Sequence, residues 1–418
     1  ALRLWARLQG EKKAEKLREL VENTPDNYLL VKTVGDLHFL RETIESADLI
    51  AVDCETFGEK SGDQFDPWVG KMAGFSVSTR ERHFYVPLNH TEKTELTENQ
   101  VFNELKNALE SAKIVMHNAP FDAKFFYVHY GVDLITNLHA DTRIMAVALD
   151  ENRSHKLKDL ITDWLKEPSD NFDQLFGSMH RFNEIPLDVA LVYAAGDTEK
   201  TLKLYYWMMR WFDSREDLQR LKKLVFKIEM PVARQFIRSD LRGIGLDLKE
   251  AERLDAHFEE EEKRLERDIY EMVGEFCLTS PAQMSKKLFD ELKLPNFNNG
   301  STEKSALEQI INKHPVIPKI LEYREINQLR KAFTKKLPHK IKADGKIHQE
   351  HNTWGAVTGR FTCKNPNTQQ MPSKRPEVRK LFVTNDPNRI FISIDYSQIE
   401  LRVLAHLSGD PVLIEAFE

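Results

Sequence analysis

The sequence has few cysteines and no long apolar run. Its three cysteines are too scattered to form a Cys-x-x-Cys pair: Cys54, Cys277 and Cys363. The sequence therefore supports neither a zinc site nor a disulfide framework, and it indicates a reducing compartment. No run of about 18 apolar residues occurs, so we expect no membrane-spanning helix and no membrane partner. A signal peptide is also lacking, and the start at Ala1 without a Met suggests a processed or trimmed form.

An excess of basic charge is absent as well. The chain has 60 Lys and Arg against 66 Asp and Glu, which gives a formal net charge of −6. This balance argues weakly against a nucleic acid as partner, but net charge averages over all faces, and binding depends on local basic stripes. A length of 418 residues, with 41% apolar and 30% charged residues, is typical of a globular protein of two or three domains.

The N-terminal half shows a pattern of strands and helices. Four segments have the apolar pattern of strands: 49–52, 71–78, 83–88 and 113–116. Four others have the apolar spacing of helices: 97–111, 140–150, 156–166 and 187–212. Three strands followed by alternating helices and strands predict a mixed sheet flanked by helices. Residues 1–26 read as one or two amphipathic helices, interpreted as a solvated lead-in.

Acidic residues follow two of these strands and lie on one helix. Asp53 and Glu55 are two positions apart at a strand end, so their side chains share a face. Asp122 follows another strand, and Tyr193 and Asp197 share one face of a helix. One acidic pair is weak support for a site in a chain with 66 acidic residues. Four carboxylates crowded together, however, would repel strongly unless divalent cations neutralised them, so the set predicts a metal site.

In order and spacing these residues resemble the 3′→5′ proofreading exonuclease domain of family A DNA polymerases. The matching stretches are Asp53-Cys-Glu55, Asn118-Ala-Pro-Phe-Asp122 and Tyr193-Ala-Ala-Gly-Asp197, and the tyrosine marks the tyrosine subclass. The resemblance covers residues 27–213. It implies an α/β fold of the ribonuclease H-like type and hydrolysis with Mg²⁺ or Mn²⁺, two ions per active site.

The resemblance also implies a role for each residue. Asp53 would bridge both ions, Glu55 and Asp197 would complete one site, and Asp122 would hold the other ion, partly through water. Tyr193 would orient the attacking water, the alternative being a core aromatic residue. Asn118 would support the site or the DNA strand end rather than bind a metal.

The C-terminal half is expected to be mainly helical. After a charged connector near 213–217, helices are expected over these residues: 218–242, 248–274, 303–313 and 316–336, with another opening near 279. From Arg324 to Lys346, eight Lys or Arg stand against two acidic residues. Such a segment can follow a phosphate backbone, although a solvated face explains it equally well. Its position corresponds to the thumb of the family.

An apolar run at 390–394 is typical of a buried strand, and Asp395 stands at its end. The spacing of Ile399, Val403 and Leu407 predicts a helix that stops at Gly409. A carboxylate in this position suits a hard cation such as Mg²⁺, the alternative being a helix N-cap.

The eight residues Asp395-Tyr-Ser-Gln-Ile-Glu-Leu-Arg402 resemble motif A of family A polymerases. By that resemblance Asp395 binds both catalytic metals of a polymerase palm. Three neighbours would lie at the incoming nucleotide: Tyr396, Gln398 and Glu400. Glu400 would help to exclude a ribose 2′-OH.

Two stretches before motif A resemble those that hold the primer–template in the family: Thr358-Gly-Arg-Phe361 and Asn365-Pro-Asn-Thr-Gln-Gln-Met-Pro372. Arg360 would reach the minor groove, where acceptors differ little between base pairs. Asn367 and Gln369 offer amides for backbone and base edges, and Arg375 and Arg379 are candidate phosphate contacts. Each residue alone is also a common turn former or surface residue.

We find neither the fingers helix, nor the second palm acid, nor a 5′-nuclease domain of that family. We therefore expect a helical lead-in (1–26), an exonuclease domain (27–213), and a thumb with the start of a palm (214–418). The expected function is a family A DNA polymerase with proofreading exonuclease, in which dNTP addition needs a missing C-terminal part. The alternatives are a DNA-binding polymerase fragment and a stand-alone exonuclease.

Four partners are expected: a primer–template, a single-stranded 3′ end, dNTPs and the missing polymerase part. The expected location is the cytoplasm of a bacterium or of a phage-infected host, with an organelle as the alternative.

Overall fold

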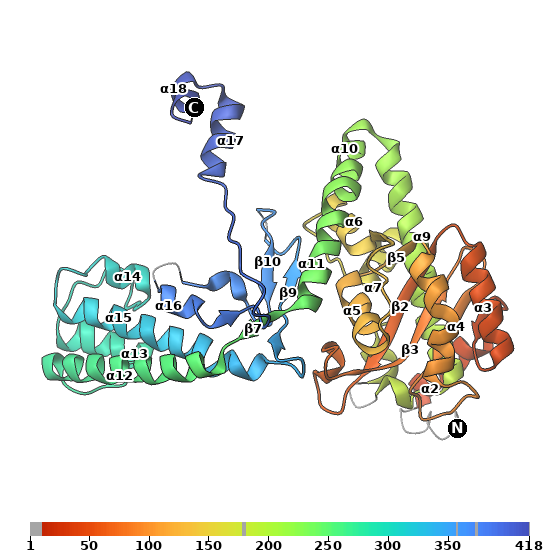
Figure 1. Cartoon of the computed structure of the whole chain (residues 1–418), viewed down its shortest axis with the longest axis horizontal. Coiled ribbons are helices and arrows are strands. Elements are labelled where there is room, and N and C mark those ends of the chain that lie inside the picture. The colour runs from red at the N-terminus through yellow and green to blue at the C-terminus, as the bar shows by residue number, and fades with distance from the viewer. Residues whose placement is uncertain (1–10, 178–180, 357, 373–374, 418) are drawn as a thin grey trace. The chain divides into compact units, whose positions relative to one another are not determined.

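The structure, a computed structural model, describes residues 11–177, 181–356, 358–372 and 375–417 (Figure 1). The chain forms two compact units. The first comprises Ala1–Gly243 with Lys340–Met371, and the second comprises Ile244–His339 with Pro372–Glu418. In the described part of the chain, no helix is both long and apolar enough to cross a membrane.

The first unit is built on a six-stranded mixed sheet. The strands are β1 (Tyr28–Leu30), β2 (Ile50–Phe57), β3 (Lys71–Ser78), β4 (His83–Pro87), β5 (Ile114–Met116) and β6 (Leu138–Asp141). Their order across the sheet is β1-β4-β3-β2-β5-β6. β3 is antiparallel to both β2 and β4, whereas the pairs β1–β4, β2–β5 and β5–β6 are parallel. The mixed sheet expected from the sequence is confirmed.

Helices cover this sheet. The helix α9 (Leu187–Ser214) packs against β1 to β5 through a largely buried face. The other principal helices are α3 (Val34–Ser46), α4 (Glu98–Ser111), α5 (Ala119–Tyr130) and α6 (Thr142–Leu149). The core includes the fully buried rings of Phe75, Phe125 and Phe126, whose removal from water is the main stabilising term.

Helix α2 (Glu11–Glu22) is not simply the solvated lead-in expected from the sequence. Its Leu17 is only 2% exposed and lies in an apolar cluster with Phe176 and Val189. Since a buried leucine contributes about 2 kcal/mol, α2 is attached to the first unit by this contact.

The helices after α9 continue the same unit. They are α10 (Glu216–Leu224), a π-helical turn (Val225–Glu229) and α11 (Met230–Arg242), which ends at Gly243 with a positive φ of 63°. Val225, Met230 and Ile237 belong to the main apolar cluster of the first unit. The helix expected over 218–242 is confirmed.

The second unit is mainly helical. Its helices α12 (Leu248–Val273) and α15 (Val316–Leu329) pack along each other, and the shorter α13 (Pro281–Ser285) and α14 (Lys304–Glu308) lie beside them (Figure 1). The strand β7 (Ile244–Leu246) pairs antiparallel with β11 (Phe382–Val383). The helices expected over 248–274 and near 316–336 are confirmed, whereas the one expected over 303–313 is shorter.

The strand expected at 390–394 is wrong. Residues 390–396 have no regular secondary structure, and Ile394 is 89% exposed. A strand needs a neighbour to accept its hydrogen bonds, and the described residues provide none here. The helix expected next is confirmed as α17 (Ile399–Ser408), which ends at Gly409 with φ 65° and is followed by α18 (Pro411–Glu415).

Candidate active site

Strand β2 places Asp53 and Glu55 at the centre of the sheet. It lies between β3 and β5, and α9 packs against it. Because alternate residues of a strand point to the same side, the two carboxylates project from one face. Both are partly buried.

Helix α5 brings Asp122 to the same place. Asn118 precedes this helix in the left-handed conformation (φ 67°), which turns the chain sharply from β5 into α5. Asp122 is 2% exposed, and its Oδ1 accepts a hydrogen bond of 2.9 Å from the backbone N–H of Cys54. This bond joins Asp122 to β2 between Asp53 and Glu55.

Helix α9 supplies Asp197 and Tyr193 one turn apart. The Tyr193 ring packs against three aromatic rings at centroid distances of 5.7 to 6.2 Å: Phe172, Phe176 and Phe182. Asp197 is 7% exposed and forms an ion pair with Lys158 of the short helix α7 (Leu157–Leu160). We call Asp53, Glu55, Asp122 and Asp197 the acidic cluster.

Electrostatics show that the acidic cluster is crowded. Burial raises the pKa of Asp53 well above its usual range, and the charges of Asp122, Glu55 and Asp197 raise it further. Burial raises the pKa of Glu55 to about 8, with a further upward contribution from Asp197. Burial likewise raises the pKa of Asp122 to about 7, although the Cys54 N–H opposes this shift. The four carboxylates expected to converge therefore lie close together.

Carboxylate oxygens are the ligands that hard cations such as Mg²⁺ and Mn²⁺ prefer, so the donor set of the acidic cluster fits a divalent cation. Within residues 11–177, 181–356, 358–372 and 375–417, however, no three His, Cys, Asp or Glu side chains are arranged ready to hold a metal.

Lys158 is the site residue that sequence reasoning missed. Its Nζ contacts Asp197 Oδ1 and lies 4.3 Å from the centroid of the Tyr193 ring. It also lines a cavity of about 470 Å³, together with Tyr193, Asp197 and residues of α2. No signal in the sequence distinguishes this lysine from those on a solvated face.

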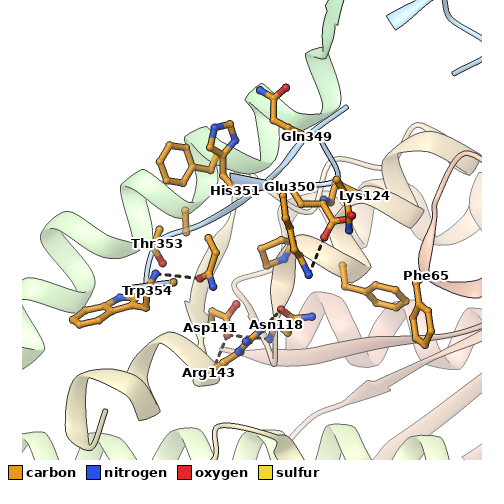
Figure 2. A pocket seen from close by; sticks show the side chains of 18 of the residues that line it. Phe65, Asn118, Lys124, Asp141, Arg143, Gln349, Glu350, His351, Thr353 and Trp354 are labelled. Atoms are coloured by element: carbon orange, nitrogen blue, oxygen red, sulfur yellow. Dashed lines mark hydrogen bonds and ion pairs between the residues drawn. The ribbon is translucent and has the colours of Figure 1, made fainter. Parts of the chain in front are cut away.

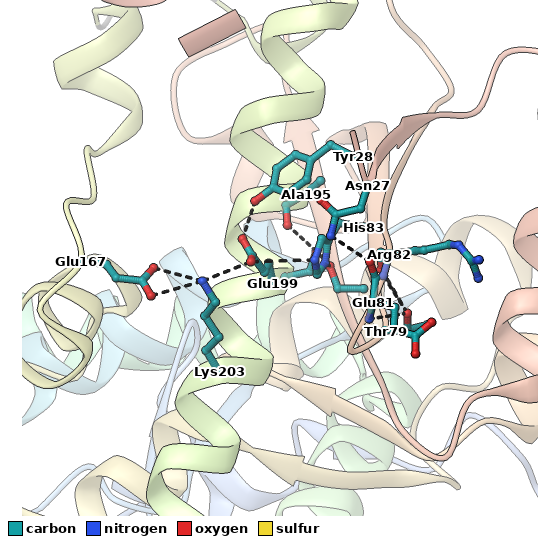
Figure 3. A network of polar contacts seen from close by, with 12 residues as sticks. Asn27, Tyr28, Thr79, Glu81, Arg82, His83, Glu167, Ala195, Glu199 and Lys203 are labelled. Atoms are coloured by element: carbon teal, nitrogen blue, oxygen red, sulfur yellow. Dashed lines mark hydrogen bonds and ion pairs between the residues drawn. The ribbon is translucent and has the colours of Figure 1, made fainter. Parts of the chain in front are cut away.

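A polar network fixes α9 beyond Asp197 (Figure 3). Glu199 accepts a hydrogen bond of 2.5 Å from the Tyr28 hydroxyl and pairs with Lys203 at 3.1 Å. Lys203 also contacts Glu167 at 3.2 Å, and on the neighbouring turn the hydroxyls of Thr198 and Ser78 are 2.7 Å apart. These bonds connect α9 to β1 and β3 beside the position of Asp197.

Asn118 lies apart from the acidic cluster. Its Oδ1 accepts a hydrogen bond of 2.8 Å from Arg143, and its backbone N–H donates to the buried Asp141 at 3.0 Å. These three residues line a separate cavity of about 860 Å³ in the first unit, together with Lys124 and Trp354 (Figure 2).

The residues expected at a polymerase site are mostly exposed. In the first unit these are Arg360, Asn367 and Gln369, with Asn367 Oδ1 accepting a hydrogen bond of 3.1 Å from the Gln369 N–H. In the second unit they are Asp395, Tyr396, Gln398, Glu400 and Arg379. Arg375 is only partly exposed and pairs with Glu325 at 3.2 Å.

The basic segment 324–346 does not form a uniform open stripe. Arg330 pairs with three acidic residues of α12 at 2.7 to 3.1 Å: Asp255, Glu259 and Glu262. Lys335 also pairs with Asp255, and Lys342 pairs with Asp66. Arg330, Lys335 and Lys342 would have to exchange these ion pairs for phosphates, so the expected phosphate-tracking role stays a prediction.

Comparison with known families divides the chain into two parts. Residues 28–211 match the family model described as 3′-5′ exonuclease, and residues 248–418 match the one described as DNA polymerase family A.

Two bacterial relatives resemble the chain over most of its length. DNA polymerase I of Borreliella burgdorferi is 32% identical over 401 residues, which cover 94% of this chain and 43% of that protein. DNA polymerase I of Treponema pallidum is 30% identical, with 88% and 41% covered. The chain therefore spans less than half the length of these relatives.

A solved structure has a similar fold. It is the POL domain of Pol1 from M. smegmatis in complex with DNA primer-template and dNTP. It superposes with a TM-score of 0.71 at 22% identity, covering 93% of this chain and 64% of that one.

Proposed function

The chain belongs to DNA polymerase family A and carries a 3′-5′ exonuclease domain, and on this basis we propose that its first unit hydrolyses the terminal phosphodiester bond at the 3′ end of a DNA strand. The observation that carries this proposal is the convergence of Asp53, Glu55, Asp122 and Asp197 from β2, α5 and α9.

In the proposed mechanism the carboxylates of Asp53, Glu55, Asp122 and Asp197 would hold Mg²⁺ or Mn²⁺, two ions per site. Bound there, the cations would supply the Lewis acid that activates the water and stabilises the leaving oxygen. Tyr193, one turn before Asp197, would hold the attacking water through its hydroxyl. The cavity beside Lys158 and Tyr193 provides space for the 3′-terminal nucleotide. Asn118, which lines the separate cavity shared with Arg143 and Asp141, would support the DNA strand rather than bind the cations.

The double variant Asp53→Ala with Glu55→Ala tests this proposal. We expect loss of Mg²⁺-dependent shortening of a 5′-labelled single strand by at least about a hundredfold, because the ligands of the cations are removed. Affinity for the same strand, measured in EDTA, should stay within a few-fold of the wild type.

The exposed residue Glu59, four positions after Glu55, provides a matched control. Glu59→Ala should retain wild-type activity. If the double variant degrades DNA at the normal rate, or if it loses binding as completely as activity, the acidic cluster is not the catalytic centre.

A second proposal concerns residues 248–418, which match DNA polymerase family A. We propose that they form part of a nucleotide-adding site for dNTPs on a primer–template. Asp395 would hold the cations, and Tyr396, Gln398 and Glu400 would contact the incoming nucleotide. A single carboxylate provides too few ligands for two cations. The proposal therefore requires further ligands from outside the described residues.

The primer–template would contact residues of both units. The candidates are Arg360, Asn367, Gln369, Arg375 and Arg379. Arg375 would have to exchange its ion pair with Glu325 for a phosphate, whereas the exposed Arg379 would not.

A further inference from the structure

Lys158 introduces a positive charge into the acidic cluster. Its side chain is 13% exposed and that of Asp197 is 10% exposed, so the ion pair between them is largely shielded from water. In the described parts of the chain, no other lysine or arginine pairs with Asp53, Glu55, Asp122 or Asp197. Among the described residues, the Lys158 ammonium is therefore the one that forms an ion pair with the acidic cluster.

The influence of this charge extends beyond its direct partner. The Lys158 charge opposes the upward pKa shifts of both Asp53 and Glu55. The ammonium also lies over the Tyr193 ring, where the negative face of the aromatic system attracts a cation. Lys200, on the next turn of α9, is also influenced by the charge of Asp197, but its Nζ donates to the carbonyl oxygen of Pro168 at 3.3 Å and, among the described residues, forms no ion pair with Asp197.

We propose that Lys158 is a resident counter-ion of the acidic cluster, which holds Asp197 until a divalent cation displaces it. This inference rests on the proposed function, because the four carboxylates are metal ligands only under that proposal. It accounts for a largely buried ion pair between Lys158 and Asp197 inside a cluster of carboxylates.

The physical consequence is competition. A cation that binds Asp197 must break the ion pair and then remain close to a positive charge, and both effects weaken its binding. Removal of the charge should therefore tighten metal binding. Structural damage caused by a substitution would weaken metal binding instead. The sign of the change in Kd therefore distinguishes loss of the competing charge from structural damage.

The test is a calorimetric titration of the whole chain with Mn²⁺. Lys158→Met keeps most of the length of the side chain but removes its charge. We expect its Kd for Mn²⁺ to fall by at least about tenfold, because a unit charge within a few ångströms of a divalent ion is repelled strongly. In EDTA its Tm should be lower than that of the wild type, and saturating Mn²⁺ should reverse the order.

Two further variants complete the test. Lys158→Arg preserves the charge and should bind Mn²⁺ nearly as the wild type does. Lys156→Met removes an exposed cation two positions before Lys158 and should change the Kd much less. An unchanged or weaker affinity in Lys158→Met overturns the inference. Absence of Mn²⁺ binding in the wild type itself would instead overturn the proposed function, and the inference with it.

Discussion

A buried hydrogen bond from the Cys54 backbone holds Asp122 in the acidic cluster. The Cys54 N–H that donates this bond lies between Asp53 and Glu55, so the bond fixes the spacing of three carboxylates. Burying a charge here costs free energy, which the raised pKa of Asp122, about 7, reflects. The residue thus has both a structural and a chemical role, and substitutions can separate them.

Asp122→Asn keeps an oxygen that can accept from Cys54 but removes one repelling charge. We expect its free energy of unfolding to match or exceed that of the wild type, and its exonuclease rate to fall by at least about a hundredfold. Asp122→Ala also leaves the Cys54 N–H unpaired, and should lose about 1–3 kcal/mol relative to Asn. Urea unfolding and strand shortening measure the two effects. Equal free energies of unfolding of Asp122→Asn and Asp122→Ala would contradict the stabilising role of the hydrogen bond.

At this scale the sequence predicted the acidic residues but not Lys158. The acidic residues stand in recognisable motifs at strand ends and on one helix face. Lys158 stands among other charged residues, Lys156 and Asp159, a pattern that is typical of a solvated surface. Only the packing of α7 against α9 shows that its ammonium reaches Asp197.

At the scale of helices and strands, a buried histidine attaches the segment just before α9 to the sheet. His90 follows β4 and is 2% exposed. Its Nε2 lies 2.7 Å from the Tyr85 hydroxyl, and its Nδ1 lies 3.2 Å from the carbonyl oxygen of Ile185. Burial lowers the pKa of His90 to about 4, with a smaller contribution from the Lys93 charge.

This depressed pKa predicts a pH-dependent stability. His90 stays neutral in the folded protein, whereas in the unfolded chain it takes up a proton near its ordinary pKa of 6.5. Its stabilising contribution is complete above that value and is lost as the pH falls toward 4. Between about pH 7 and pH 5 the wild type should lose about 2 kcal/mol more than His90→Gln. Urea unfolding of both proteins at the two pH values checks this, and parallel losses would contradict it.

The sequence predicted elements well where periodicity was long. Helices α9 and α12 extend over 28 and 26 residues, and their apolar spacing was clear. The strands β1 and β6, with three and four residues, are too short to show a period. Helix α3 was missed although Thr33 and Asp36 form a capping box. The strand expected at 390–394 failed because strand formation depends on a neighbour, which no local pattern reveals.

At the scale of the whole molecule, the two units do not follow chain order. Residues 340–371 join the first unit although residues 244–339 separate them from Gly243, and α10 and α11 pack there too. Amphipathic helices show which face is buried but not what covers it. The functional borders expected at residues 26 and 213 therefore stay predictions, and the compact units describe packing alone.

The central claim is that the first unit degrades DNA from the 3′ end. The most direct measurement incubates the chain with Mg²⁺ and one single strand, labelled either at its 5′ or at its 3′ end. We predict that the 3′ label is released at once as a mononucleotide, while the 5′ label remains in a ladder that shortens one nucleotide at a time. Both changes should stop in EDTA. No release, or release of the 5′ label first, would contradict the account.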